Sequence, residues 1–132
     1  MEKAELKLRT KAFSLRALKL VRHLPRDVTG KVLANQLTRS ALSVGANYRS
    51  ACRARSRAEF LSKLGIVLEE ADESAHWLEI IIEDKLLPAS KVSALLQEAN
   101  ELTAIFFTAT ATTRRAPLPK SRVVQDEPNR IS

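Results

Sequence analysis

The residues of this chain that could bind a metal ion lie far apart. Its two histidines, His23 and His76, fall in different segments. Glu73 and His76 have the i, i+3 spacing that places two side chains on one face of a helix. Metal sites inside helical bundles use such a pair twice, on two helices, whereas it occurs once here. The sequence therefore predicts no metal site.

The residues that could do covalent or phosphate chemistry are also isolated. Cys52 is the single cysteine, so no internal disulfide can form, and no sequence signal indicates a histidine that would activate its thiol. With three glycines, the chain has no glycine-rich phosphate-binding loop. The carboxylates around residues 69–73 are typical of a solvated acidic helix face. We therefore expect a protein that is not an enzyme and that uses no cofactor.

Four segments with helical periodicity must position any functional surface. They run over about 4–24, over about 29–54, from Ser56 to about 86, and from Ser90 to about 113. Short links between long helices make successive helices antiparallel. The sequence therefore predicts an all-α, antiparallel, up-down-up-down four-helix bundle over residues 1–115. Residues 116–132 are polar and marked by prolines, and we expect a disordered basic tail there.

Each segment carries one apolar stripe that is predicted to form the core. The stripes consist of Leu6, Phe13, Ala17, Leu20 and Leu24; Leu33, Leu37, Ala41, Val44, Tyr48 and Ala51; Phe60, Leu64, Val67, Leu68, Ala71, Ala75, Leu78 and Ile82; and Val92, Leu95, Leu96, Ala99, Leu102 and Phe106. Helix starts are marked by polar residues that can accept hydrogen bonds from free backbone N–H groups. Asp27 or Thr29 can cap the second helix, Ser56 and Glu59 form a capping box for the third, and Ser90 can cap the fourth.

The second segment also carries a small residue and a polar stripe. Gly45 lies within the helical pattern, where it would allow a neighbouring helix to approach closely. The polar stripe flanks the core and consists of Gln36, Ser43, Asn47 and Ser50. It is either a solvated edge or a polar seam against another helix, because polar side chains need hydrogen-bond partners once they are buried.

Six apolar residues fall outside the predicted core stripes. They are Leu8, Leu15, Leu18, Ile66, Trp77 and Ile80. A wide stripe or a bent helix could hide them, and scattered surface apolar residues are normal. The alternative is a second buried surface, formed when the chain associates with itself through its first and third helices. Tryptophan is a frequent anchor of such interfaces.

Charge is segregated along the chain, whose formal net charge is +7. Residues 1–26 carry eight basic and two acidic side chains, and residues 27–55 carry five and one, so the first half has a net charge of +10. Residues 56–87 carry three basic and eight acidic side chains, a net charge of −5. Outward-facing residues of the two regions could form ion pairs, within a subunit or between subunits. The residues concerned are Arg39, Arg49 and Arg53 on the second helix, and Glu69 and Glu73 on the third.

The basic balance suggests a polyanionic partner, although it could also serve only solubility. No helix-turn-helix, zinc finger or aromatic stacking platform is recognisable, so RNA or DNA would be bound through phosphates with little reading of bases. The candidate contacts are Lys3, Lys7, Lys11, Lys19, Arg22, Arg26, Arg114, Arg115, Lys120 and Arg122. We expect an oligomeric scaffold that binds nucleic acid. The alternative is a protein-interaction oligomer whose basic surface binds an acidic protein.

The central residues resemble a known family. Residues 36–49 read QLTRSALSVGANYR, which is similar to the core motif of bacterial four-helix bundle proteins called 23S rRNA intervening-sequence or S23-like proteins. Residues 53–64 read RARSRAEFLSKL, and residues 69–79 read EEADESAHWLE, and both look like later segments of that family. The family often has an acidic residue near position 50 or 51, where this chain has Ser50 and Ala51.

The resemblance implies a four-helix bundle that commonly assembles as a homopentamer around a central pore, with no known catalytic residues. Related accessory proteins of diversity-generating retroelements engage a reverse transcriptase and nucleic acid, so both classes of partner are expected here.

The first eleven residues lack the apolar region of a signal peptide, and no apolar run approaches the roughly 20 residues that span a membrane. We therefore expect a cytoplasmic protein.

Overall fold

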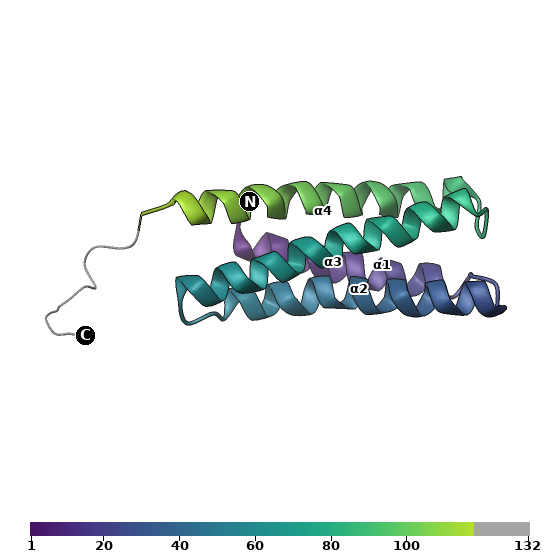
Figure 1. Cartoon of the computed structure of the whole chain (residues 1–132), viewed down its shortest axis with the longest axis horizontal. Coiled ribbons are helices and arrows are strands. Elements are labelled where there is room, and N and C mark those ends of the chain that lie inside the picture. The colour runs from purple at the N-terminus through teal and green to yellow at the C-terminus, as the bar shows by residue number, and fades with distance from the viewer. Residues whose placement is uncertain (118–132) are drawn as a thin grey trace, which may run out of the picture.

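The computed structural model describes residues 1–117, and they form four α-helices (Figure 1). The helices are α1 (Lys3–Val21), α2 (Val28–Cys52), α3 (Arg57–Glu83) and α4 (Ala89–Arg115). Each helix packs against the next along the chain, and α4 closes the ring against α1. The predicted all-α, up-down-up-down bundle is thus confirmed. The predicted tail lies outside the described residues from position 118 onward.

A continuous apolar core runs along the bundle axis. Phe13, Leu37, Val67 and Phe106 contribute one fully buried side chain from each helix. The predicted stripe of α3 is wrong at its last turn, where Ile81 is fully buried and Ile82 is only half-buried. The same stripe can continue from Leu78 by three or by four residues, and packing near the helix end selects three. Three other residues of the predicted stripes, Phe60, Leu68 and Leu96, are half-buried against the core.

Capping fixes where the helices begin. Asp27 Oδ1 accepts a hydrogen bond from the Gly30 backbone N at 2.8 Å, which selects Asp27 over Thr29 as the cap of α2. Ser56 Oγ accepts from the Glu59 backbone N at 3.0 Å, so the predicted start of α3 is confirmed. The Glu59 carboxylate accepts in return from the Arg55 backbone N at 2.9 Å, which fixes the chain entering the helix.

The predicted serine cap of α4 is wrong. The N-cap is Pro88, the helix begins at Ala89, and Ser90 lies inside the first turn. Proline fixes its own φ, here −60°, and this places the start of the helix two residues earlier than a Ser90 cap would. No side chain caps this helix, and its first turn contains no acidic residue.

The end of α3 explains why that helix is shorter than predicted. Lys85 adopts a positive φ of 58°, a conformation that only glycine enters without strain. The Leu86 backbone N then donates to the Ile81 carbonyl and the Lys85 backbone N to the Ile82 carbonyl, both at 3.0 Å. These two bonds form a Schellman motif, which satisfies the last carbonyls of the helix and turns the chain toward α4.

Gly45 marks a close approach of α1 and α2, as the sequence predicted. A Cβ atom at this position would lie 3.0 Å from Ser14 Oγ and 3.4 Å from the Thr10 carbonyl oxygen. Ser14 Oγ also donates a 2.6 Å hydrogen bond to the Ala41 carbonyl, across the two helices.

Within residues 1–117, no helix combines the length and the apolar character needed to cross a membrane.

Candidate subunit and nucleic-acid interfaces

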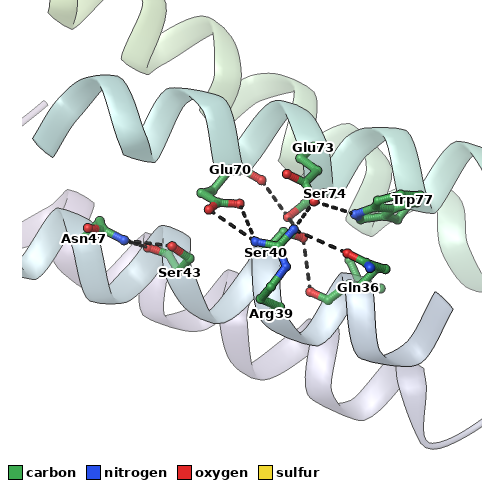
Figure 2. A network of polar contacts seen from close by, with 10 residues as sticks. Gln36, Arg39, Ser40, Ser43, Asn47, Glu70, Glu73, Ser74 and Trp77 are labelled. Carbon is green, nitrogen blue, oxygen red and sulfur yellow. Dashed lines mark hydrogen bonds and ion pairs between the residues drawn. The ribbon is translucent and has the colours of Figure 1, made fainter. Parts of the chain in front are cut away.

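A polar network joins the outer edges of α2 and α3 (Figure 2). Arg39 Nη1 lies 3.4 Å from both carboxylate oxygens of Glu70, and its Nη2 atom pairs with Glu73. Glu73 Oε2 also accepts a 3.1 Å hydrogen bond from Trp77 Nε1. Three residues predicted for a subunit interface, Arg39, Glu73 and Trp77, therefore interact with one another within the chain. Trp77 is half-buried and packs against the core, so less of it faces solvent than its position on the helix suggested.

Beneath this network, two serines form a buried contact between α2 and α3. Ser40 and Ser74 are fully buried, and their hydroxyl oxygens lie 2.8 Å apart. Each also reaches a carbonyl of its own helix, that of Leu37 at 3.3 Å and that of Glu70 at 2.8 Å. This pair was not predicted from the sequence. The sequence did contain a signal for it, because Ser40 lies between Leu37 and Val44 at the spacing that core residues of a helix follow.

The predicted polar stripe of α2 is half-buried and is satisfied mainly along its own helix. Asn47 Nδ2 donates to the Ser43 carbonyl at 2.9 Å and to Ser43 Oγ at 2.7 Å. Gln36 Oε1 accepts from Arg39 at 3.5 Å. The polar seam between helices is therefore the Ser40–Ser74 pair rather than this stripe.

An apolar strip with basic margins lies on the outer surface between α1 and α2. Leu8, Leu15 and Leu42 are 72%, 52% and 43% exposed, and they line one groove of about 470 Å³. Four cationic side chains line the same groove: Lys7, Lys11, Arg49 and Arg53. We call these seven residues the α1–α2 face. It unites members of both predicted sets, the interface residues and the nucleic-acid contacts, and it adds Leu42, which was not predicted.

The outer edge of α3 carries the opposite charge. Glu69, Asp72 and Glu79 are exposed there, and Ile66 and Ile80 are half-buried beside them. We call these five residues the acidic edge. Leu18, the remaining apolar interface candidate, is half-buried on α1. Of the six apolar residues predicted to lie off the core, only Leu8 and Leu15 are largely exposed.

Helix α1 begins and α4 ends at the same end of the bundle (Figure 1), and basic residues gather there. Lys3, Arg55, Arg114 and Arg115 are exposed there, and we call them the basic end. None of the four forms an ion pair within residues 1–117.

Two contacts hold this end together. Lys3 Nζ lies 5.0 Å from the centre of the Phe60 ring, a cation–π contact between α1 and α3. Arg57, at the start of α3, donates to the carbonyls of Thr113, Arg114 and Ala116. The last carbonyls of α4 are thereby satisfied by a cation, which also suits the negative end of the helix dipole.

The structure does not bring the ten predicted nucleic-acid contacts onto one surface. Lys19, Arg22 and Arg26 lie at the opposite end of the bundle from Lys3 and Arg114, because a helix of 19 residues spans roughly 28 Å. Lys7 and Lys11 belong to the α1–α2 face. Lys120 and Arg122 lie outside the described residues.

Arg9 of α1 forms ion pairs with α4 that were not predicted from the sequence. Arg9 Nε and Nη2 donate to the Glu98 carboxylate at 2.7 and 2.9 Å, and Nη2 donates to Glu101 at 2.7 Å. The hydrogen bond to Glu98 raises the pKa of Arg9, although partial burial opposes this. This ion-pair cluster joins α1 to α4, and it removes one cation from the set that a polyanion could contact.

The potentially reactive residues do not assemble into a site. Within residues 1–117, no three His, Cys, Asp or Glu side chains come close enough to hold a metal ion. His76 is exposed and lies edge-on to Trp77, with 5.0 Å between ring centres. Cys52 is half-buried near Tyr48, where burial and a hydrogen bond with the thiol raise the pKa of the tyrosine.

The comparisons with known proteins agree with the residues quoted above. A family model described as the 23S rRNA-intervening sequence protein matches residues 2–107. The chain belongs to this family. A crystal structure from Bacteroides thetaiotaomicron, described as a protein of unknown function from the S23 ribosomal protein family, is 30% identical and superposes with a TM-score of 0.77. The match covers 84% of this chain and 99% of that one. No curated protein matched the chain.

Proposed function

We propose that this member of the 23S rRNA-intervening sequence protein family is a non-enzymatic oligomeric scaffold that binds nucleic acid through backbone phosphates. The observation that carries the proposal is the separation of three exposed surfaces on one rigid bundle: the α1–α2 face, the acidic edge and the basic end. The polar groups between α2 and α3, in the Arg39 network and the Ser40–Ser74 pair, bind each other. They hold the helices in register and leave function to the outer surfaces.

Self-association is supported by the α1–α2 face and its complement on the same chain. Three exposed leucines beside four cations form a surface that an acidic and partly apolar partner would cover. The acidic edge has that character, with three exposed carboxylates next to Ile66 and Ile80. Because the two surfaces are different, their contact would be head-to-tail, and such contacts close into rings when the rotation allows. This geometry agrees with the pentamer that the family resemblance implies.

Nucleic-acid binding is supported by the basic end, none of whose residues belongs to the α1–α2 face or to the acidic edge. Its four cations are exposed and unpaired within the described residues, and a ring would repeat them once per subunit. Multiple phosphate contacts give affinity with a steep salt dependence. The chain is only 5% aromatic, which favours backbone contacts over base stacking.

Charge exchange tests the subunit contact. Arg49→Glu places a carboxylate opposite the acidic edge, so the particle mass measured by light scattering should fall toward that of one chain. Glu69→Arg should lower it as well, and the double variant should restore it, because the pair of charges is inverted. If the double variant is as dissociated as either single variant, Arg49 and Glu69 do not face each other.

Fluorescence anisotropy with a 20-base-pair duplex tests the nucleic-acid surface. The Arg114→Gln/Arg115→Gln variant should weaken binding and reduce the slope of log K against log salt by about 0.9 for each phosphate that is no longer neutralised. The matched control removes two exposed lysines at the opposite end, Lys31→Gln/Lys85→Gln, and should leave the slope nearly unchanged. Equal effects of both variants would indicate attraction to net charge alone. Absence of binding to any duplex would favour an acidic protein partner instead.

A further inference from the structure

A second groove of about 470 Å³ lies between α1 and α4, at the end of the bundle where α4 begins. It opens here because α1 and α4 are the neighbouring helices that pack least extensively. Its floor is apolar and consists of Leu20 and Leu95, which are nearly buried, and of Leu87. The exposed side chain of Ala94 lies on the wall formed by α4 and leaves the groove open.

Basic side chains stand on both sides of this apolar floor. Arg16, Lys19 and His23 line it from α1 and the turn that follows, and Lys91 lines it from α4. All four are exposed, none forms an ion pair within residues 1–117, and no carboxylate lines the groove. The groove also adjoins the positive end of the α4 dipole, where the first turn contains no acidic residue to balance it.

We propose that this groove binds a small anionic amphiphile, a fatty-acid-like molecule with an apolar chain and one carboxylate. The apolar floor accommodates the chain, and the cations on both sides attract the headgroup. The volume lies within the range of roughly 300–1,000 Å³ that small-molecule sites occupy. This inference is independent of the proposed scaffold function, because neither the α1–α2 face, the acidic edge nor the basic end contributes a residue to the groove.

Two other occupants fit the groove less well. Arg16 to His23 covers about two helical turns, roughly 10 Å, which is short for a partner helix that must bury a stable interface. No phenylalanine, tyrosine or tryptophan lines the groove, so it offers no stacking platform for a nucleic-acid base. A short aliphatic carboxylate needs neither a long interface nor an aromatic ring on which to stack.

Isothermal titration calorimetry of the full chain with sodium decanoate tests the proposal, with decyltrimethylammonium as a probe of the same chain length and opposite charge. We expect decanoate to bind once per chain and the cationic probe to show no saturable binding. The Arg16→Gln/Lys91→Gln variant should weaken decanoate binding by about fivefold, as expected for two exposed charge contacts. Ala94→Phe, which places a ring in the groove, should abolish binding.

The matched control is Ala104→Phe, a change of an exposed alanine on the same helix that does not line the groove. It should leave decanoate binding unchanged, and circular dichroism should show that both phenylalanine variants are folded. The proposal is overturned if decanoate does not bind, if both probes bind equally well, or if Ala94→Phe binds decanoate as tightly as Ala104→Phe does.

Discussion

Two stretches of the outer surface of α2 differ in how their arginines relate to the neighbouring helices. Arg39 lies beside α3, where the carboxylates of Glu70 and Glu73 pair with it. Arg49 and Arg53 lie ten and fourteen residues further along, at and just beyond the last turn of α2, and they line the α1–α2 face together with Lys7 and Lys11. The arginine next to α3 is neutralised within the subunit, whereas the other two are grouped with further cations.

The difference shows in which part of α2 the charged side chains find partners within the chain. Four cations around one groove repel each other, and none of them forms an ion pair within the described residues. The three exposed leucines beside them add an apolar surface that water covers poorly. Both costs are relieved by one kind of partner, an acidic surface with apolar residues. The α2–α3 seam has no such deficit, which supports the proposal that the seam serves the fold and the α1–α2 face serves assembly.

The largest expected effect comes from placing a charge in the middle of the α1–α2 face. Leu15→Asp should dissociate the assembly, because a carboxylate would be buried against the acidic edge of the neighbouring subunit. Val32→Asp is the matched control, since Val32 is also 52% exposed and lies outside that groove. Light scattering should show one chain for Leu15→Asp and an unchanged particle for Val32→Asp. Equal masses for the two variants would remove Leu15 from the interface.

A bulky side chain in the buried serine contact should have the next largest effect, on the fold rather than on assembly. Ser74→Leu inserts a larger side chain where the two hydroxyl oxygens are 2.8 Å apart, and it should lower the free energy of unfolding by about 2–3 kcal/mol. Ser62→Leu, at an exposed position of the same helix, should change it by less than about 0.5 kcal/mol. Urea denaturation measures both. A small effect of Ser74→Leu would mean that the seam is loosely packed.

Two glycines within helices offer a smaller and opposite pair of effects. Gly65→Ala should stabilise the chain by about 0.5–1 kcal/mol, because a Cβ there meets nothing within 4 Å and alanine is the better helix former. Gly45→Ala should stabilise the chain less than Gly65→Ala does, or should destabilise it, because the added Cβ would lie 3.0 Å from Ser14 Oγ. Thermal unfolding of the two variants checks the order. Equal stabilisation would show that α1 moves away from Gly45 without cost.

The smallest expected effect on stability distinguishes Arg39, which is paired with α3, from Arg49, which lines the α1–α2 face. Arg39→Gln should lower the free energy of unfolding by about 0.2–0.5 kcal/mol, since it removes exposed ion pairs with two carboxylates. Arg49→Gln should not lower it and should weaken assembly instead. Unfolding is best compared at a concentration low enough to dissociate the particle. If Arg49→Gln destabilises the single chain as much as Arg39→Gln does, the α1–α2 face is part of the fold.

The fold could be predicted from the sequence because its signals are local and repeated. Apolar spacing defined four helices, and the short links between them left few topologies. Errors occurred where a single contact decided the outcome, as at Pro88, which starts α4 before Ser90, and at Lys85, whose positive φ ends α3 early. The choice of Ile81 over Ile82 likewise depends on packing between helices, which a spacing rule does not resolve.

The candidate surfaces could be predicted only in part, because they depend on which helix lies next to which. Helical spacing placed Leu8 and Leu15 off the core, and both are exposed. Spacing alone could not show that Trp77 would pack against the core, or that Leu42 would join the two leucines of α1. The basic residues were grouped by their positions along the chain, and the bundle distributes them over two ends and a groove. Arg9 was missed because its partners are roughly ninety residues away on α4.

Light-scattering mass of the full chain, with and without a short nucleic-acid duplex at low and at high salt, tests the central claim most directly. We expect a particle several times the 14.7 kDa of one chain, and we expect it to gain the mass of the duplex at low salt and to lose it at high salt. A particle of 14.7 kDa at every concentration, with no gain on adding the duplex, would contradict both the assembly and the binding.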